Sequence, residues 1–236
     1  CNMACVYCQN YEFSQMGSGK EVGFEELADY MLQLQDMGCH NINLVSPTHV
    51  LPQFLKALSI AVPKGLRIPI VYNTGGYELP EIIKLLDGIV DIYLPDMRYA
   101  DNALAIKYSA APDYPKYNQE ALLEMHRQVG VAKLDKEGII KKGLIIRHLV
   151  LPDNIAGTEQ IMKFIATQLS KDTYISLMSQ YFPCYKAAEY KDILRRITSE
   201  EYESAKAAME KYGLSNGWLQ DSHGLDRFAG TNIKPI

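Results

Sequence analysis

Three of the five cysteines lie within the first eight residues of this 236-residue chain. Cys1, Cys5 and Cys8 have the spacing C-x3-C-x2-C, whereas Cys39 and Cys184 are far from them in the sequence. An odd number of cysteines, with three crowded together, is a poor framework for disulfides. Three thiolates can instead bind one metal centre if the loop that carries them curls around it. The spacing therefore predicts that Cys1, Cys5 and Cys8 are metal ligands.

Two metal centres fit three thiolates. Structural zinc needs four ligands, so a histidine or another cysteine would have to join from elsewhere. A four-iron, four-sulfur cubane held by three cysteines leaves one iron without a protein ligand, where a small molecule can be coordinated. The residues between the cysteines are mostly apolar and lack the charge typical of exposed zinc knuckles. The loop favours the cubane, with zinc and a metal-free loop as the alternatives.

The rest of the chain predicts the elements that would position this loop. Short apolar runs alternate with segments of helical periodicity, and the predicted strands span residues 41–46, 68–73, 89–94, 144–151 and 173–180. Short buried strands interleaved with helices indicate βαβ units and a parallel sheet, whose functional loops leave the carboxyl ends of the strands. The fold class is therefore α/β. A first strand is expected upstream of residue 1, and without it we expect residues 1–8 to be poorly anchored.

Helix signals are legible in several places. A helix is predicted from Phe24 to a stop at Gly38, and Thr198 with Glu201 forms a capping box for a later helix. Asn118 is predicted to cap another helix, after a loop over residues 112–117 that is rich in proline and tyrosine. No repeat or low-complexity stretch divides the chain. We expect one domain over residues 1–236, with residues 213–236 as irregular C-terminal cover.

Composition excludes several classes of protein. Lysine and arginine number 24 against 28 aspartate and glutamate, a net charge of −4, whereas a binder of nucleic acid would show a strong basic excess. No apolar run reaches the 18 residues that a membrane-spanning helix needs. Free cysteines that do not form a disulfide framework are typical of a reducing compartment. We expect a cytoplasmic protein with no nucleic-acid or membrane partner.

The stretch C-N-M-A-C-V-Y-C, followed by Gln9 and Asn10, resembles the radical S-adenosylmethionine (SAM) enzymes. Their cysteine signature is C-x3-C-x-aromatic-C, and Tyr7 fills the aromatic position. The chain is most similar to the subgroup related to pyruvate formate-lyase activating enzyme. Matching stretches run almost from end to end: residues 1–12, 42–53, 69–78, 90–99, 147–152, 178–181 and 201–220.

The resemblance implies a fold, two cofactors and a reaction. The fold is a partial (β/α)6 TIM-like barrel with the cysteine loop after its first strand. The cofactors are a [4Fe-4S] cluster and SAM, whose amino and carboxylate groups chelate the open iron. Flavodoxin or ferredoxin reduces the cluster, and SAM is cleaved to methionine and a 5′-deoxyadenosyl radical that abstracts hydrogen from a substrate. In activating enzymes that substrate is a glycyl radical enzyme.

Several cofactor contacts follow from the resemblance. An aspartate of the activating enzymes that contacts the methionine amino group corresponds to Asn73. Their D-x-K motif, which contacts ribose and carboxylate, corresponds to Asp96-Met97-Arg98, and a guanidinium can bind a carboxylate in place of the lysine. Their Gly-Gly-Glu loop is absent here, and residues 46–49 replace it.

Four further residues complete the predicted cofactor site. Thr48 and His49 stand in the loop that replaces Gly-Gly-Glu, and Gln180 stands near a histidine of the family. Arg147 and His148 are neighbours on a predicted strand, so only one of them can face the site, and we favour Arg147. Two other functions stay open: a metal-binding module without radical catalysis, which holds structural zinc or carries electrons, and an enzyme that modifies a small molecule.

Overall fold

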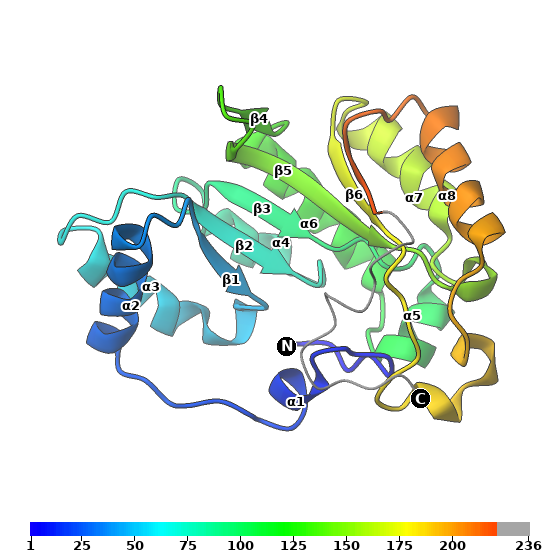
Figure 1. Cartoon of the computed structure of the whole chain (residues 1–236), viewed down its shortest axis with the longest axis horizontal. Helices are drawn as coiled ribbons and strands as arrows, with labels where there is room; N and C mark the ends of the chain where they lie inside the picture. Colours follow the sequence, from blue (N-terminus) through cyan, green and yellow to red (C-terminus); the bar gives the residue numbers. More distant parts are fainter. Residues whose placement is uncertain (221–236) are drawn as a thin grey trace.

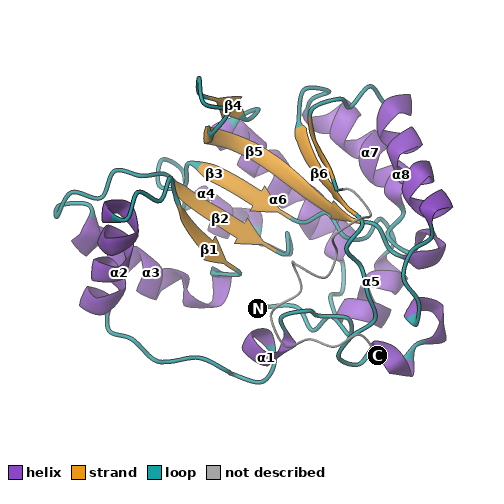
Figure 2. Cartoon of the chain, in the orientation of Figure 1, coloured by secondary structure: helices purple, strands orange, loops and turns teal. Residues whose placement is uncertain are grey.

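The computed structural model describes residues 1–220, and a twisted, mostly parallel sheet forms its centre (Figures 1 and 2). The strands are β1 (Ile42–Val45), β2 (Ile70–Thr74), β3 (Ile92–Pro95), β4 (Lys133–Leu134), β5 (Ile140–Leu149), β6 (Tyr174–Met178) and β7 (Gly217–Leu219). They are ordered β1-β2-β3-β5-β6-β7, with every neighbouring pair parallel, and β4 pairs antiparallel with β5. This order, which follows the chain, is that of a partial TIM-like barrel.

Two helices precede the first strand, the others connect later strands, and most of them cover one face of the sheet (Figure 2). They are α1 (Tyr11–Ser14), α2 (Phe24–Asp36), α3 (Leu51–Ala61), α4 (Pro80–Lys84), α5 (Asn102–Ser109), α6 (Tyr114–Val129), α7 (Thr158–Phe164) and α8 (Ser199–Lys211). In Figure 2, α2 and α3 lie beside β1, α4 and α6 lie behind the central strands, and α7 and α8 lie beside β6. Thr198 and Glu201 form the predicted capping box at the start of α8.

The two faces of the sheet have different surroundings because successive strand side chains point to opposite sides. Tyr72 and Tyr93 belong to the large apolar core under the helices. Val71 and Ile92, one position before each of them, belong to a small apolar cluster on the inner face. The same alternation continues past the apolar residues and decides which polar side chains reach the interior of the barrel at the strand ends.

The structure confirms the α/β class and the five strands predicted from the sequence, and it corrects two other predictions. The predicted loop over residues 112–117 is shorter, because α6 already begins at Tyr114 after Asp113, so Asn118 lies inside the helix and does not cap it. Part of the predicted irregular cover is regular, because residues 217–219 form β7 beside β6. Residues 221–236 of that cover lie outside the described residues, and the strand expected before residue 1 stays a prediction. Among residues 1–220, the structure has no helix of the length and apolarity needed to cross a membrane.

His148 lies on the helix-covered side of β5 and is fully buried. Its Nδ1 is 2.7 Å from the carbonyl oxygen of Met97, and its Nε2 is 2.9 Å from the Thr158 hydroxyl. The carbonyl can only accept, so Nδ1 carries the proton and Nε2 accepts from Thr158. Burial lowers the pKa of His148 to about 4, which keeps the ring neutral in the folded protein.

We expect this buried histidine to make the protein less stable in acid. Between about pH 6.5 and pH 4 the unfolded chain binds a proton at His148 that the folded chain does not, so stability falls as the pH falls through this window. The loss approaches about 3 kcal/mol at the acid end. Urea unfolding measures the free energy of unfolding between pH 7 and pH 4. In H148Q this free energy should not show the loss caused by His148, whereas H40Q, which changes an exposed histidine, should show it in full. Equal pH dependence in H148Q and the unsubstituted protein would contradict the assignment.

Candidate metal centre and cofactor cavity

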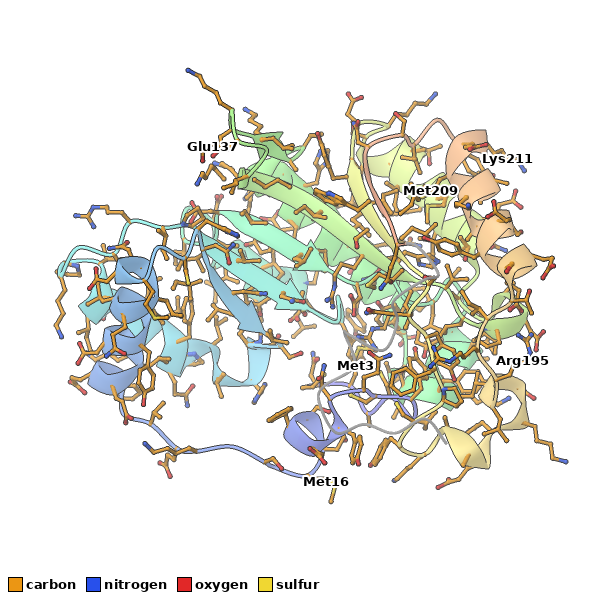
Figure 3. The ribbon with its side chains drawn as sticks, in the orientation of Figure 1. Met3, Met16, Glu137, Arg195, Met209 and Lys211 are labelled. Atoms are coloured by element: carbon orange, nitrogen blue, oxygen red, sulfur yellow. The ribbon has the colours of Figure 1, made fainter. Side chains whose placement is uncertain are left out.

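The cysteine loop, residues 1–10, lies across the carboxyl ends of the strands, and Met3 marks its position in Figure 3. The expectation that this loop is poorly anchored was wrong. Backbone N–H groups of Ala4 and Val6 donate to the carbonyl oxygens of Ser109 (3.0 Å) and Tyr108 (2.9 Å) at the end of α5. The N–H of Lys186 donates to the carbonyl oxygen of Val6 (2.9 Å). Two distant segments therefore fix the loop from opposite sides.

Side chains of the segment after β6 strengthen the second of these contacts. The rings of Tyr7 and Tyr181 pack edge to face with centroids 5.6 Å apart, and the Cys184 thiol donates to the carbonyl oxygen of Tyr7 (3.4 Å). Just beyond the loop, Tyr11 stacks on Tyr185 with centroids 4.8 Å apart. Such aromatic pairs contribute beyond the area that they bury. The loop therefore has a fixed conformation before any ligand binds.

A cavity of about 540 Å³ opens in front of this loop. All three cysteines of the signature line it, together with residues from the ends of the parallel strands. The lining residues are Cys1, Met3, Cys5, Cys8, Asn10, Phe13, Ser14, Val45, Ser46, His49, Asn73, Thr74, Gly75, Arg98 and Arg147. A pocket at the carboxyl ends of barrel strands is where this architecture places its chemistry.

Asp96 joins two arginines at the wall of the cavity. Its Oδ2 accepts hydrogen bonds from Arg98, with Nε at 2.8 Å, and its Oδ1 accepts from Arg147, with Nε at 2.7 Å. The side chain of Asp96 is 5% exposed, against 24% for Arg98 and 28% for Arg147. The strands hold this geometry, because Asp96 and Arg147 are paired residues at the ends of β3 and β5.

The electrostatics of this group favour an anionic ligand. Burial alone would raise the pKa of Asp96, but Arg147 and Arg98 lower it below its ordinary value, so the carboxylate is charged. The neighbouring Asp96 carboxylate in turn outweighs burial and raises the pKa of Arg98 well above its ordinary value. Two guanidinium groups and one carboxylate leave one net positive charge facing the cavity, where a ligand carboxylate can be bound.

Two glycines after β2 permit the close packing behind this wall. A side chain at Gly75 would lie 2.8 Å from the sulfur of Met3 in the cysteine loop. Gly76 has φ +74°, and a Cβ there would overlap the carbonyl oxygen of Asp96 and the amide of Asn118. Asn118 Nδ2 donates to the carbonyl oxygens of both Gly76 and Asp96 at 2.9 Å. Only glycine fits this approach, so the turn is required by packing at the site.

Cys5 is the most buried of the three cysteines, and its sulfur has the most hydrogen bonds. It is buried, and its sulfur accepts hydrogen bonds from Arg98 Nη1 (3.1 Å) and the Ser109 hydroxyl (3.0 Å). Burial raises the pKa of the free Cys5 thiol, and Arg98 and Ser109 oppose that rise. Cys1 and Cys8 are half-buried, and the sulfur of Cys8 is 3.2 Å from the Ser14 hydroxyl. Donors aimed at a sulfur are the environment that a metal-bound thiolate needs.

The three thiols and the cavity beside them are compatible with an iron–sulfur cubane. Within residues 1–220, no three His, Cys, Asp or Glu side chains are placed to hold a single metal ion. A cubane offers each thiolate its own iron, so its ligands need not meet at one point. Three thiols at one end of a large cavity, with hydrogen bonds ready for the sulfur of Cys5, match that requirement.

The structure brings some of the residues predicted to bind the cofactor into the cavity and places others behind it. Asn73, His49, Arg98 and Arg147 line the cavity, and Asp96 holds the two arginines. Arg147 lines the cavity, whereas its neighbour His148 is buried on the opposite side of the strand.

Three others have side chains engaged elsewhere. The hydroxyl of Tyr7 contacts that of Tyr99 (2.5 Å), and Thr48 donates to Glu78 (2.7 Å). The amide oxygen of Gln180 accepts from Gln220 (3.2 Å). Direct contact of these three with a cofactor stays a prediction.

Sequence reasoning missed several residues that shape the site. Ser109 and Tyr99 lie behind the cysteine loop, and nothing in their local sequence marks them. Glu78 is a buried carboxylate whose Oε1 accepts from Thr48 and Thr74, while its Oε2 has no hydrogen-bond partner among the described residues. Burial raises the pKa of Glu78, although the two threonine hydroxyls oppose that rise. The signal for Asn118 was present, because a polar residue within an apolar helical stripe often has a buried partner.

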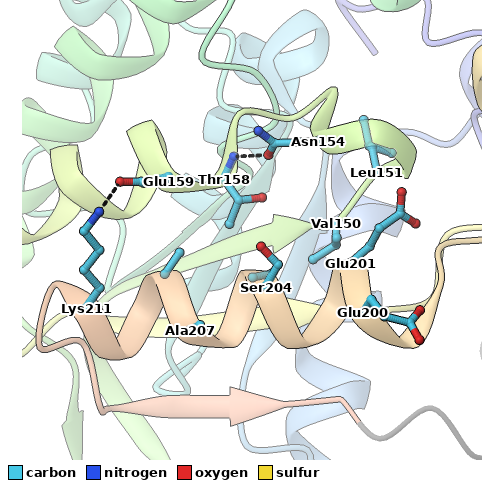
Figure 4. Close-up of a pocket in the computed structure, with 12 residues that line it drawn as sticks. Val150, Leu151, Asn154, Thr158, Glu159, Glu200, Glu201, Ser204, Ala207 and Lys211 are labelled. Carbon is cyan, nitrogen blue, oxygen red and sulfur yellow. Dashed lines mark hydrogen bonds and ion pairs between the residues drawn. The ribbon is translucent and has the colours of Figure 1, made fainter.

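A second cavity of about 460 Å³ lies between α7 and α8 (Figure 4). Three of its four charged side chains have ion-pair partners: Lys211 pairs with Glu159 (2.5 Å), and Glu201 pairs with Arg195 (2.8 Å) outside the cavity, whereas Glu200 is in no ion pair among the described residues. Its floor is the alanine-rich face of α8, and no cysteine or histidine lines it. Cysteine and histidine, the residue types most suited to metal binding, line the cavity of the cysteine loop instead.

The sequence profile described as the Radical SAM superfamily matches residues 1–165. The chain belongs to the radical SAM superfamily. This family uses a [4Fe-4S] cluster and SAM, in agreement with the cofactors predicted from the cysteine signature. Uncharacterized protein MJ0674 of Methanocaldococcus jannaschii is 34% identical over 224 residues, which are 91% of this chain. The chain spans 61% of the length of that relative.

Several solved structures have the same fold. The structure described as native anSMEcpe with bound AdoMet has a TM-score of 0.60 at 13% identity and covers 92% of this chain and 61% of its own. HydG, a maturase of the [FeFe]-hydrogenase, has a TM-score of 0.58 at 12% identity and covers 93% of this chain and 49% of its own. Methylornithine synthase (PylB) has a TM-score of 0.57 at 13% identity and covers 90% of this chain and 60% of its own. These likenesses establish the partial barrel fold.

The buried Asp96 should be essential for stability. In D96N the two guanidinium groups lose their shared carboxylate, and breaking such a buried group costs about 3–5 kcal/mol. D87N is the matched control, because Asp87 pairs with Arg127 at 2.7 Å but both side chains are about half exposed. That exposed pair should contribute less than about 1 kcal/mol. Urea unfolding at pH 7 measures both, and equal losses in D96N and D87N would contradict the role given to Asp96.

Proposed function

We propose that this protein is a radical SAM enzyme that binds SAM in the cavity of about 540 Å³ next to Cys1, Cys5 and Cys8. The observation that carries this proposal is that the three thiols line the same cavity as Arg98 and Arg147, which together with Asp96 have a net charge of one positive unit. When bound, the reduced cluster and SAM supply the chemistry, which is cleavage of the sulfonium to methionine and a 5′-deoxyadenosyl radical that abstracts hydrogen from a substrate.

The residues of the chain have distinct roles in this proposal. The three cysteine thiolates bind iron and leave one iron for SAM. Arg98 and Arg147 bind the carboxylate of its methionine moiety, and Asp96 holds both guanidinium groups in orientation. Three N–H groups of Arg98 are engaged by Asp96 and Cys5, which leaves two of its five donors for a ligand. Asn73 and His49 line the same cavity and contact the remainder of the ligand.

A finer proposal concerns the substrate. The sequence similarity to activating enzymes over most of the chain supports a glycyl radical enzyme as the protein partner. Phe13 and Val45 line the cavity and are 69% and 64% exposed, so its rim offers apolar side chains to a partner. The electron donor in this proposal is flavodoxin or ferredoxin, and the compartment is the cytoplasm.

Anaerobic reconstitution with iron and sulfide tests the metal centre. We expect about four irons and four sulfides per chain, with broad absorption near roughly 400 nm from charge transfer between thiolate and iron. C5A should lose the cluster because it removes the buried ligand. C39A should keep it, because Cys39 does not line the cavity. One zinc per chain without sulfide would support the metal-binding module instead, and no 5′-deoxyadenosine from a loaded protein under dithionite would exclude radical catalysis.

Arg147 should contribute to SAM affinity. Removing a charged hydrogen-bond donor to a carboxylate costs about 1.5–3 kcal/mol, so R147Q should raise the Kd of the loaded protein for SAM roughly 10- to 100-fold. R127Q is the control, because Arg127 also pairs with carboxylates but lies on α6 away from the cavity. Equilibrium dialysis at matched cluster content measures the Kd. An unchanged Kd in R147Q would remove Arg147 from the binding site.

The partner proposal has its own test. The loaded protein, SAM and a reductant are incubated with a purified glycyl radical enzyme, and electron paramagnetic resonance (EPR) of the partner is recorded. We expect a glycyl radical signal that depends on SAM and is absent with C5A. Formation of 5′-deoxyadenosine without a radical in any candidate partner would favour a small-molecule substrate on the same cofactor chemistry.

A further inference from the structure

A chain of buried hydroxyl groups ends on the sulfur of Cys5. The Tyr7 hydroxyl is 2.5 Å from the Tyr99 hydroxyl, which is 2.7 Å from the hydroxyl of Ser109. Ser109 in turn donates to Cys5 Sγ at 3.0 Å. All four side chains are at most 4% exposed. Neither the cavity nor the arginine pair explains this hydroxyl chain, because Tyr7, Tyr99 and Ser109 do not line the cavity.

The direction of the hydrogen bonds follows from counting protons. A metal-bound thiolate can only accept, so the single hydroxyl hydrogen of Ser109 is directed at Cys5. Ser109 must then accept from Tyr99, and Tyr99, having used its own hydrogen, must accept from Tyr7. Each bond polarises the next, so the Ser109 hydroxyl is a stronger donor to the sulfur than an isolated serine would be.

The backbone fixes the end of this hydroxyl chain. The Ser109 carbonyl oxygen accepts from Ala4 N–H (3.0 Å), so Ser109 contacts the cysteine loop through its backbone as well as its side chain. Ser109 is the last residue of α5, and Ala110 after it has a left-handed conformation with φ +50°. The end of the helix therefore fixes the backbone of Ser109, and hydrogen bonds to Tyr99 and Cys5 hold its hydroxyl at the sulfur.

We propose that the Tyr7–Tyr99–Ser109 hydroxyl chain is a positioning device that raises the reduction potential of the cluster through the hydrogen bond to Cys5. This inference rests on the proposed function. The cluster takes one electron from a low-potential one-electron donor and passes from the 2+ to the 1+ state, with no proton transferred. The added negative charge is shared with the thiolates, so a donor at Cys5 stabilises the reduced state more than the oxidised state. Arg98 Nη1 acts on the same sulfur from the cavity side.

The test measures the midpoint potential of the cluster by titration followed by EPR of the reduced state. S109A, which removes the donor, should shift the potential to a more negative value. Y99F keeps the Ser109 hydroxyl but removes the group that polarises it, so its shift should have the same sign and be smaller. Y108F is the matched control, because Tyr108 is the neighbouring residue on α5 and its hydroxyl donates to Asp192, away from Cys5. Its potential should equal that of the unsubstituted protein.

A spectroscopic signature separates the hydrogen bond from a general change of packing. Pulsed EPR of the reduced cluster, in H₂O and in D₂O, should show one exchangeable proton fewer in S109A and no loss in Y108F. An unchanged potential in cluster-loaded S109A, or a shift in Y108F as large as in S109A, would overturn the inference. If S109A does not load, an unchanged potential in Y99F would overturn it. Failure of the unsubstituted protein to load a cubane would instead overturn the proposed function.

Discussion

The buried Asp96 carboxylate holds the wall of the cavity together. It lies at the end of β3, where strand pairing aligns it with Arg147 on β5, and Arg98 reaches it from two residues further along the chain. Hydrogen bonds to the buried carboxylate orient each guanidinium, and both arginines line the cavity. Arg98 also reaches Cys5, so the charge that orients the ligand site also contacts the metal site. Arg98 thus links the arginine–aspartate group that would bind the ligand carboxylate to the cysteine loop that would bind the metal.

The cysteine loop forms the opposite wall of the cavity, and residues far away in the sequence hold it in place. The end of α5 and the segment after β6 hold it through backbone hydrogen bonds, while a cluster of buried tyrosines packs behind it. A loop that is held in this way loses less conformational entropy when a metal binds than a free loop would. The same packing keeps water away from the sulfur of Cys5, which strengthens the hydrogen bonds that it accepts.

Much of this arrangement was predictable from local sequence. The short apolar runs located five strands, and the alternation of side chains placed Arg147 on the inner face and His148 under the helices. The cysteine spacing predicted which three thiols share one cavity. Ser109 was not predictable, because its hydroxyl meets Cys5 across 104 residues and only the tertiary fold brings the two together. Asn118 was misassigned because its amide could cap a helix locally, whereas the fold uses it to hold the carbonyl oxygens of Gly76 and Asp96.

The central claim is that one cavity holds both an iron–sulfur cubane and SAM. An anaerobic crystal structure of the reconstituted protein with SAM tests it most directly. The account predicts a cubane with Cys1, Cys5 and Cys8 each on a different iron, and the fourth iron bound by the amino and carboxylate groups of SAM. It also predicts that carboxylate within hydrogen-bonding distance of Arg98 or Arg147. A single zinc at the cysteines, or SAM bound away from the arginines, would contradict the account.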